Sequence, residues 1–447
     1  MFQTICGAQT RNIDGYRSSI LTIICCLFAA LLALPADAAE RSDTAMTLAA
    51  AIQLALSDNP DLQVYRFRET GLQGLVENAS LRPPIDLSAE AENIGGTNHY
   101  SDFESAEFTL ALSSVIELGD KREARVAAAE AQRWVIAGER QTRALDLMGE
   151  VTRRYVEVVA TQARLDLAVS SRSLAQELVQ SVEHRARAGA APEAESLRAR
   201  ASLAQAELVV SEEQNRLRSA RLSLSVLWGD MEPDFVRVSG NLGNLGDVGD
   251  FNTLYERAIQ NPAIELFASE ERLREAEIQL ATSQSNTDIG WSVGIRQFQE
   301  TNDTAFVAGL SIPLVGAKRN SGAAQSARAA RDETSLRRES ALLNLRASLF
   351  DAYQQRKLGI ETASSLRSDV IPLLQRALQQ TQEAYENGRY SYQEWAAAQQ
   401  ELLSAEHALI AAASAALHSG ATIEQLTSEP LLPPLEPGSS NAEQETE

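Results

Sequence analysis

The side chains that most often bind metals or carry out catalysis are few and scattered in this sequence. The four histidines stand far apart along the chain, at His99, His184, His407 and His418. They form no cluster with cysteine and carboxylate side chains at the spacing of metal ligands. There is also no Walker loop, nucleophile elbow or dinucleotide-binding fingerprint. We therefore expect a chain that is not an enzyme and that has no metal site or cofactor of its own.

Polar and aromatic side chains gather instead around two glycines, at points where long polar helices are expected to reverse. The residues are Arg185, Arg187 and Gly189 at the first reversal, and Gly388, Arg389, Tyr390, Ser391 and Glu394 at the second. A glycine suits such a reversal because it accepts backbone angles that other residues avoid. From these residues alone, each site is a helical hairpin turn with a polar and aromatic tip.

A very long helix leads to the first reversal. The stretch 119–188 has no proline, and at about 1.5 Å per residue it would extend for roughly 100 Å, too long for a compact domain to enclose. Its apolar residues step by three and four, which is the period of a coiled-coil contact. They are Met148, Val151, Tyr155, Val158, Leu165 and Val169, with Gln162 in one place of the series. A simple coiled-coil rod would give the same pattern.

Two segments with a period of two precede this helix, at residues 85–95 and 105–116. Leu87 and Ala89 alternate with polar residues in the first, and Phe108, Leu110 and Leu112 do so in the second. Two such strands joined by a polar loop predict a hairpin with one apolar and one polar face. A membrane barrel has this pattern, because one face meets lipid and the other meets water. A soluble hairpin with two different faces would look the same.

The first 39 residues predict a secretory signal peptide. Basic residues precede an apolar run over residues 20–34, and small residues follow it at 36–39. All three cysteines, Cys6, Cys25 and Cys26, fall inside this segment. The formal net charge of the whole chain is -21, so binding to the phosphates of nucleic acid is not expected.

The second half of the chain repeats the first. Asn261-Pro262 corresponds to Asn59-Pro60, and Gly388 corresponds to Gly189, at offsets of 202 and 199 residues. We therefore expect a first repeat at 40–235, a linker at 236–250, a second repeat at 251–428 and a disordered acidic tail at 429–447. In the second repeat the strands are predicted near 288–299 and 304–313, and the long helix at 316–387.

This duplicated unit of helix, two strands, long helix, turn and helix resembles the TolC family of outer-membrane efflux channels. The resemblance covers nearly all of the chain after the signal peptide. It is carried by the segment LSIPL at 310–314, by YENGRYS at 385–391, and by the order of the elements. The segment VIELGDKREAR at 115–125 is similar to the branch of the family that serves heavy-metal and cation exporters.

The resemblance implies a mainly α-helical chain with a β-barrel part. Four strands from each of three protomers would form a twelve-stranded barrel in the outer-membrane lipid, continued by a helical barrel in the periplasm. Four strands cannot close a barrel alone, and open strand edges are not tolerated in lipid. A homotrimer is therefore expected.

The resemblance also assigns roles to the two tips. In the family the tips meet the α-hairpin of a periplasmic adaptor, which links the channel to an inner-membrane pump of the RND type. Members commonly carry acidic residues six and nine positions after the second glycine, which narrow the periplasmic mouth as rings. Glu394 occupies the first of these positions, but Ala397 occupies the second. A single gate ring of Glu394 is therefore expected.

The function that follows is a passive exit duct for substrate delivered by the pump and the adaptor, with heavy-metal cations as candidate cargo. Two alternatives stay open at this point. The same channel could serve type I protein secretion or drug efflux, or the chain could be a periplasmic coiled-coil scaffold without a barrel.

Overall fold

The structure is a computed structural model that describes residues 45–100, 102–314 and 320–430. The predicted signal peptide lies outside these ranges, as do residues 431–447 of the predicted tail and residues 316–319 at the predicted start of the second long helix. The chain divides into two units, Met1–Ala45 and Met46–Glu447, and all the elements named below belong to the second.

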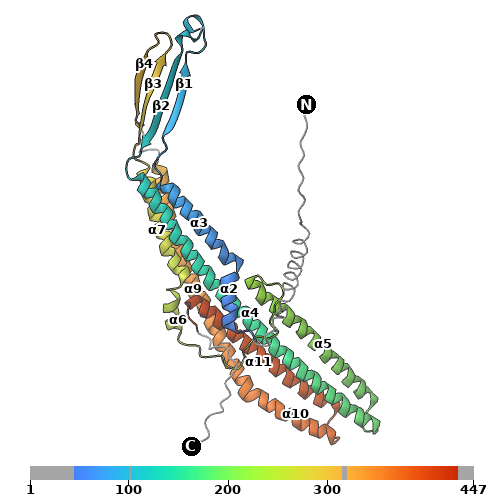
Figure 1. Cartoon of the computed structure of the whole chain (residues 1–447). Coiled ribbons are helices and arrows are strands. Elements are labelled where there is room, and N and C mark those ends of the chain that lie inside the picture. Colours follow the sequence, from blue (N-terminus) through green and yellow to red (C-terminus); the bar gives the residue numbers. More distant parts are fainter. Residues whose placement is uncertain (1–44, 101, 315–319, 431–447) are drawn as a thin grey trace, which may run out of the picture. The chain divides into compact units, whose positions relative to one another are not determined.

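Four antiparallel strands form one sheet in the order β1-β2-β3-β4 (Figure 1). Their bounds are Asp86–Glu92 for β1, Glu107–Ile116 for β2, Ile289–Phe298 for β3 and Thr304–Ser311 for β4. All four fall within the predicted segments, and each is shorter than its segment at one or both ends. The two hairpins lie about 200 residues apart in sequence, and β2 joins β3 through ten residue pairs, from Glu107↔Phe298 to Ile116↔Ile289.

The expected difference between the two faces of the sheet is present. Thr109 and Ala111 lie on one face of β2, and Phe108, Leu110 and Leu112 lie on the other because successive side chains alternate. Apolar residues of β1, β3 and β4 in register with the second set share that apolar face. Leu87, Val293 and Leu310 are examples, and these three are exposed.

The helices form two similar sets, one for each hairpin. In each set two helices precede the hairpin and the others follow it. Their bounds are α2 Leu48–Asp58, α3 Pro60–Ser80, α4 Lys121–Arg187, α5 Glu193–Ser225, α6 Phe251–Ala258, α7 Pro262–Ser283, α9 Ser321–Ser365, α10 Ile371–Glu386 and α11 Tyr392–Thr427. Helix α4 packs against α3, α5, α7 and α11, and α9 packs against α7 and α11. A mainly helical fold with a small sheet, as the sequence predicted, is confirmed.

The entry to α4 explains the glycine that starts the predicted helix. Gly119 has a φ of +77°, and a Cβ there would lie 1.9 Å from the side-chain nitrogen of Asn286. Lys121, at the first turn of α4, is buried and its Nζ lies 2.7 Å from Oδ1 of Asp288, just before β3. The motif at 119–125 therefore joins α4 to the segment that leads into β3.

The second long helix differs from the prediction. Residues 316–387 were expected to form one helix, but α9 ends at Ser365 and a π-helical turn, Leu366–Val370, separates it from α10. Pro372 lies in the first turn of α10. Proline has no N–H and its ring clashes with the carbonyl of the preceding turn, so the regular ladder of hydrogen bonds is broken just before it.

The coiled-coil pattern in α4 predicts its buried face only in the middle. Val151, Tyr155 and Val158 are fully buried, whereas Met148 and Val169 are exposed. Toward the tip the buried positions shift to Ala168, Ala175, Leu178, Val179 and Val182. A stripe that shifts in this way indicates that α4 exchanges one set of neighbours for another along its length.

The segment predicted as a linker, 236–250, packs tightly against the helices. The backbone N–H and C=O of Val238 bond to the side-chain amide of Gln162 at 2.9 and 3.1 Å. The guanidinium of Arg356, which is fully buried, donates to the carbonyl oxygens of Leu245 at 2.6 Å and Asp247 at 3.1 Å. Loop backbone is thus satisfied by buried helix side chains, as interior polar groups require.

Each repeat is closed by an asparagine. Asn59 caps the start of α3, and its amide also donates to the carbonyl of Leu227, 168 residues later, at 2.8 Å. Asn261 caps α7 and donates to the carbonyls of Gln425 and Leu426 at 2.9 and 3.0 Å. The equivalent side chain therefore joins the start of the second helix of each copy to the end of that copy, at the turn after α5 in the first and at the end of α11 in the second.

Candidate functional site at the helical hairpin tips

The first tip is the turn between α4 and α5. Gly189 has a φ of +72°, and its N–H donates to the carbonyl of Ala186 at 3.0 Å. The N–H of Ala190 donates to the carbonyl of Arg185 at 2.9 Å. These two bonds satisfy carbonyl groups that the end of α4 would otherwise leave unpaired, and the left-handed glycine makes the turn possible.

The second tip is the turn between α10 and α11, and it is built in the same way. Gly388 has a φ of +71° and donates to the carbonyl of Tyr385 at 2.9 Å. The N–H groups of Arg389 and Tyr390 both point to the carbonyl of Ala384, at 2.8 and 3.3 Å. The tip leaves Arg389 and Tyr390 exposed, the latter at 48%.

Glu394, the predicted gate residue, takes part in a capping box at the start of α11. Its carboxylate accepts from the N–H of Ser391 at 2.7 Å and from the hydroxyl at 2.9 Å, while its own N–H donates to Oγ of Ser391 at 3.4 Å. These hydrogen bonds lower the pKa of Glu394, which is exposed. The side chain is therefore held at the helix start in its charged form.

Arg185 binds the first tip to the second. It donates to the carbonyl of Tyr385, and its guanidinium carbon lies 4.4 Å from the centre of the Tyr385 ring. The Tyr385 hydroxyl lies 3.4 Å from the Glu195 carboxylate, and its ring centre is 5.1 Å from that of Trp395. Both α-hairpins contribute to this cluster, so it fastens α4 and α5 to α10 and α11.

The aromatic residues near the tips mostly point inward. Tyr385 and Trp395 are 1% and 3% exposed, and they form one apolar cluster with Tyr392, Leu178 and Val182. Tyr392 was not singled out from the sequence. It directly follows the cap residue Ser391, and neither the strand alternation nor the helical period distinguishes that position. Among the predicted tip and gate residues, the side chains of Arg187, Arg389, Tyr390, Ser391 and Glu394 are exposed. Arg185 is half-buried and engaged in the packing.

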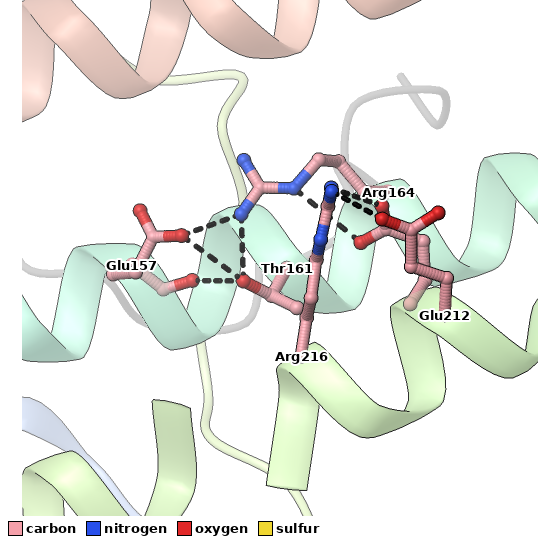
Figure 2. Close-up of polar contacts among 6 residues, drawn as sticks. Glu157, Thr161, Arg164, Glu212 and Arg216 are labelled. Carbon is pink, nitrogen blue, oxygen red and sulfur yellow. Dashed lines mark hydrogen bonds and ion pairs between the residues drawn. The ribbon is translucent and has the colours of Figure 1, made fainter. Parts of the chain in front are cut away.

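A second polar cluster lies further along α4, and the sequence analysis missed it. Figure 2 shows Arg164 beside Glu157 and Thr161 on the same helix, opposite Glu212 and Arg216 of α5. The distances are 2.5 Å from Arg164 to Glu157 and 2.5 Å from Arg216 to Glu212. The buried Glu213 also takes part, 2.8 Å from Arg216 and 3.6 Å from Arg164.

The electrostatics of this second cluster centre on Glu157. The neighbouring His418, on α11, and a hydrogen bond from Arg164 lower its pKa to about 2, against the opposing effect of burial. The carboxylate is therefore ionised at any physiological pH, and it is contacted by side chains of two helices, α4 and α11. The cluster joins α4 to α5 and α11, and we assign it to the packing of the helices.

Neither cluster has the side chains of a metal centre. Across the described ranges of the chain, no three histidine, cysteine, aspartate or glutamate side chains come together in a way that could hold a metal ion. His184 is exposed at the first tip, while His418 lies 3.7 Å from Glu157. In the same ranges, no helix has both the length and the apolar character needed to cross a membrane.

Comparison with known proteins gives the family. The sequence matches the profile described as "Outer membrane efflux protein" over residues 51–230 and 254–429. The chain belongs to this family. One matched segment corresponds to each repeat, so this outer membrane efflux protein carries the family's pattern twice. Each matched segment includes one of the two tips.

Two relatives and one solved structure illustrate what this outer membrane efflux protein is similar to. It is 28% identical over 353 residues to the cobalt-zinc-cadmium resistance protein CzcC of Cupriavidus metallidurans, covering 77% of this chain and 81% of the relative. It is 24% identical over 270 residues to the nickel-cobalt-cadmium resistance protein NccC of Alcaligenes xylosoxydans xylosoxydans, 60% of each chain. The Campylobacter jejuni CmeC outer membrane channel superimposes with a TM-score of 0.70 at 17% identity, over 86% of each chain.

These findings confirm the resemblance to the TolC-like channels and the outer-membrane location. They also decide against a periplasmic coiled-coil scaffold, because the match includes the strands as well as the helices. The family consists of efflux proteins, not enzymes. The roles of the individual tip residues in docking and gating stay predictions.

Proposed function

We propose that three copies of this outer membrane efflux protein form a passive exit duct through the outer membrane. The observation that carries the proposal is the sheet. It has one apolar and one polar face, and both of its outer strands, β1 and β4, are free to pair. Because four is an even number, β4 of one copy and β1 of the next run antiparallel, so three copies can close a ring of twelve strands without an exposed edge.

The apolar face supports lipid as its surroundings. Phe306 is 94% exposed, Leu310 70% and Leu87 67%, and all three lie on this face. At about 25 cal/mol per Å², leaving such a face in water would be very costly, whereas the hydrocarbon of a bilayer accepts it. The polar face would then line a water-filled passage, as in other membrane barrels.

The helices support the rest of the assembly. The two repeats, residues 40–235 and 251–428, each contribute a long helical hairpin that continues from the sheet and ends in a tip with exposed polar residues. We propose that these tips receive a periplasmic adaptor, which brings substrate from an inner-membrane pump of the RND type. Arg187, Arg389, Tyr390 and Ser391 form the surface for that contact.

Heavy-metal cations are the proposed cargo. The two relatives above are named for resistance to cobalt and cadmium together with zinc or nickel. In this arrangement the pump and the adaptor select the metal.

Closure of the barrel can be tested with disulfides between copies. No cysteine lies among the described residues, so single cysteines can be introduced on the two edges. Ala89→Cys on β1 should cross-link to one of three partners on β4, Phe306→Cys, Ala308→Cys or Leu310→Cys, and give a covalent trimer in non-reducing gels. The control is Ala111→Cys on the inner strand β2 with the same β4 partners, which should give none. A fully folded monomer in detergent would refute the barrel.

Docking can be tested by replacing two exposed tip residues. In cells that depend on this protein for resistance, Arg389→Ala with Tyr390→Ala should restore sensitivity to cobalt, zinc and cadmium. The trimer should remain at the same level and heat stability, because exposed tip residues contribute little to the packing. Arg367→Ala, an exposed arginine on the π-helical turn far from the tip, is the control. Unchanged resistance in the tip variant would exclude these side chains from the adaptor contact.

A further inference from the structure

Arg296, on β3, crosses the polar face of the sheet and contacts three other side chains there. Its Nε lies 2.8 Å from Oγ1 of Thr109, directly opposite on β2. Its Nη1 lies 2.9 Å from the Glu107 carboxylate, and its Nη2 lies 2.9 Å from the Glu92 carboxylate on β1. One guanidinium thus connects three strands.

This arrangement places an arginine between two carboxylates that face each other. Glu92 and Glu107 are paired directly across β1 and β2, where like charges repel. The planar fork of arginine can bind both at once, which a lysine cannot do as well. Asn93 also donates to Glu107, at 3.3 Å.

We propose that Arg296 determines the ion selectivity of the outer mouth of the duct by neutralising part of its negative charge. The proposal rests on the barrel described above, in which the polar face lines the passage. Among the described strand residues this face carries four carboxylates, Asp86, Glu90, Glu92 and Glu107, and a single cation, Arg296. Arg296 engages two of the four, and Asp86 and Glu90 have no ion-pair partner in the same ranges.

The position of the Arg296, Glu92 and Glu107 side chains allows their charge to act on ions that enter the passage. Glu92 ends β1 and Glu107 begins β2, so the cluster lies at the hairpin end of the sheet, away from the helices (Figure 1). In a trimer the same residues would occur three times around one ring. Fixed charges that line a narrow aqueous passage with low-dielectric walls concentrate counter-ions, so each change in the ring alters the ratio of cations to anions that pass.

The test is the permeability ratio of potassium to chloride, measured from reversal potentials of the full protein in planar bilayers. Arg296→Gln removes one positive charge per protomer and should raise the ratio by about twofold or more. Glu90→Gln removes one negative charge from the same face and should lower the ratio. The two variants therefore predict shifts of opposite sign.

Controls separate selectivity from folding. Arg296→Lys keeps the charge and loses the fork, so its ratio should stay close to that of the unchanged protein even if the barrel becomes less heat-stable. Arg337→Gln removes an exposed charge from α9 and should leave the ratio unchanged. If Arg296→Gln and Glu90→Gln both conduct with an unchanged permeability ratio, the inference about Arg296 is wrong, but the proposed channel function is supported. If the unchanged protein forms no channel, the proposed function itself fails.

Discussion

At the scale of single residues, Glu394 has two roles to separate, helix capping and gating. Glu394→Gln removes the charge but keeps an acceptor for the N–H of Ser391, so the capping box survives. We expect an unchanged thermal midpoint together with weaker cation preference and weaker block by divalent cations in planar bilayers. Ser391→Ala is the converse variant, which should cost about 1 kcal/mol of stability without a change of selectivity. Unchanged selectivity in Glu394→Gln would leave the carboxylate with the capping role alone.

The Glu157 carboxylate gives a prediction about acid stability. Its pKa falls from 4.5 to about 2 on folding, first through His418 and then through Arg164. Because the folded-state pKa is the lower one, its stabilising effect is complete above about pH 4.5 and is lost as the pH falls toward 2. The free energy of unfolding, measured by denaturation at pH values from 6 to 2, should therefore decrease more steeply with falling pH for the unchanged protein than for Glu157→Gln. Equal slopes would show that Glu157 does not contribute to acid stability in this way.

Among the helices, Arg185 should determine how firmly the two hairpins hold together. Arg185→Ala removes the cation–π contact with Tyr385 and the hydrogen bond to its carbonyl, a loss of about 2 kcal/mol. We expect faster amide hydrogen exchange at the end of α10 and the start of α11, with little effect near the sheet. Arg187→Ala is the matched control, since its Nε donates within its own helix, to the carbonyl of Glu183 at 3.3 Å. Equal exchange in both variants would mean that the contacts of Arg185 with Tyr385 do not hold the two hairpins together.

The elements also show what the sequence could and could not predict. The strands were predictable because Phe108, Leu110 and Leu112 alternate with polar residues, and α4 was predictable because no proline interrupts it. The break before α10 was missed although Pro372 indicates it, because the helical period continues on both sides. The Arg296 cluster could not be predicted, since its members are distant in sequence and their meeting depends on strand register.

At the scale of the whole molecule, Arg356 fastens the segment that connects the two repeats. It donates to the carbonyls of Leu245, Asp247 and Ala416, and burial lowers the pKa of its guanidinium, which stays charged. Arg356→Met would leave these carbonyls unpaired, and we expect a loss of about 3 kcal/mol in chemical denaturation. Arg367→Met, whose exposed guanidinium bonds to Leu242 and Gly243, should cost about 1 kcal/mol or less. A similar small loss in both variants would show that the connection is held elsewhere.

The paired asparagines have a consequence for the origin of the chain. Since Asn59 and Asn261 each join the start of the second helix of their own half to the end of that half, one half already has the closing contact of a separate subunit. Six such ancestral subunits, each with two strands, would complete the same ring of twelve. Duplication and fusion would then turn six equal tips into two alternating sets of three that can diverge. Pro192 now stands where the other copy has its capping Ser391, so the two sets have already become different.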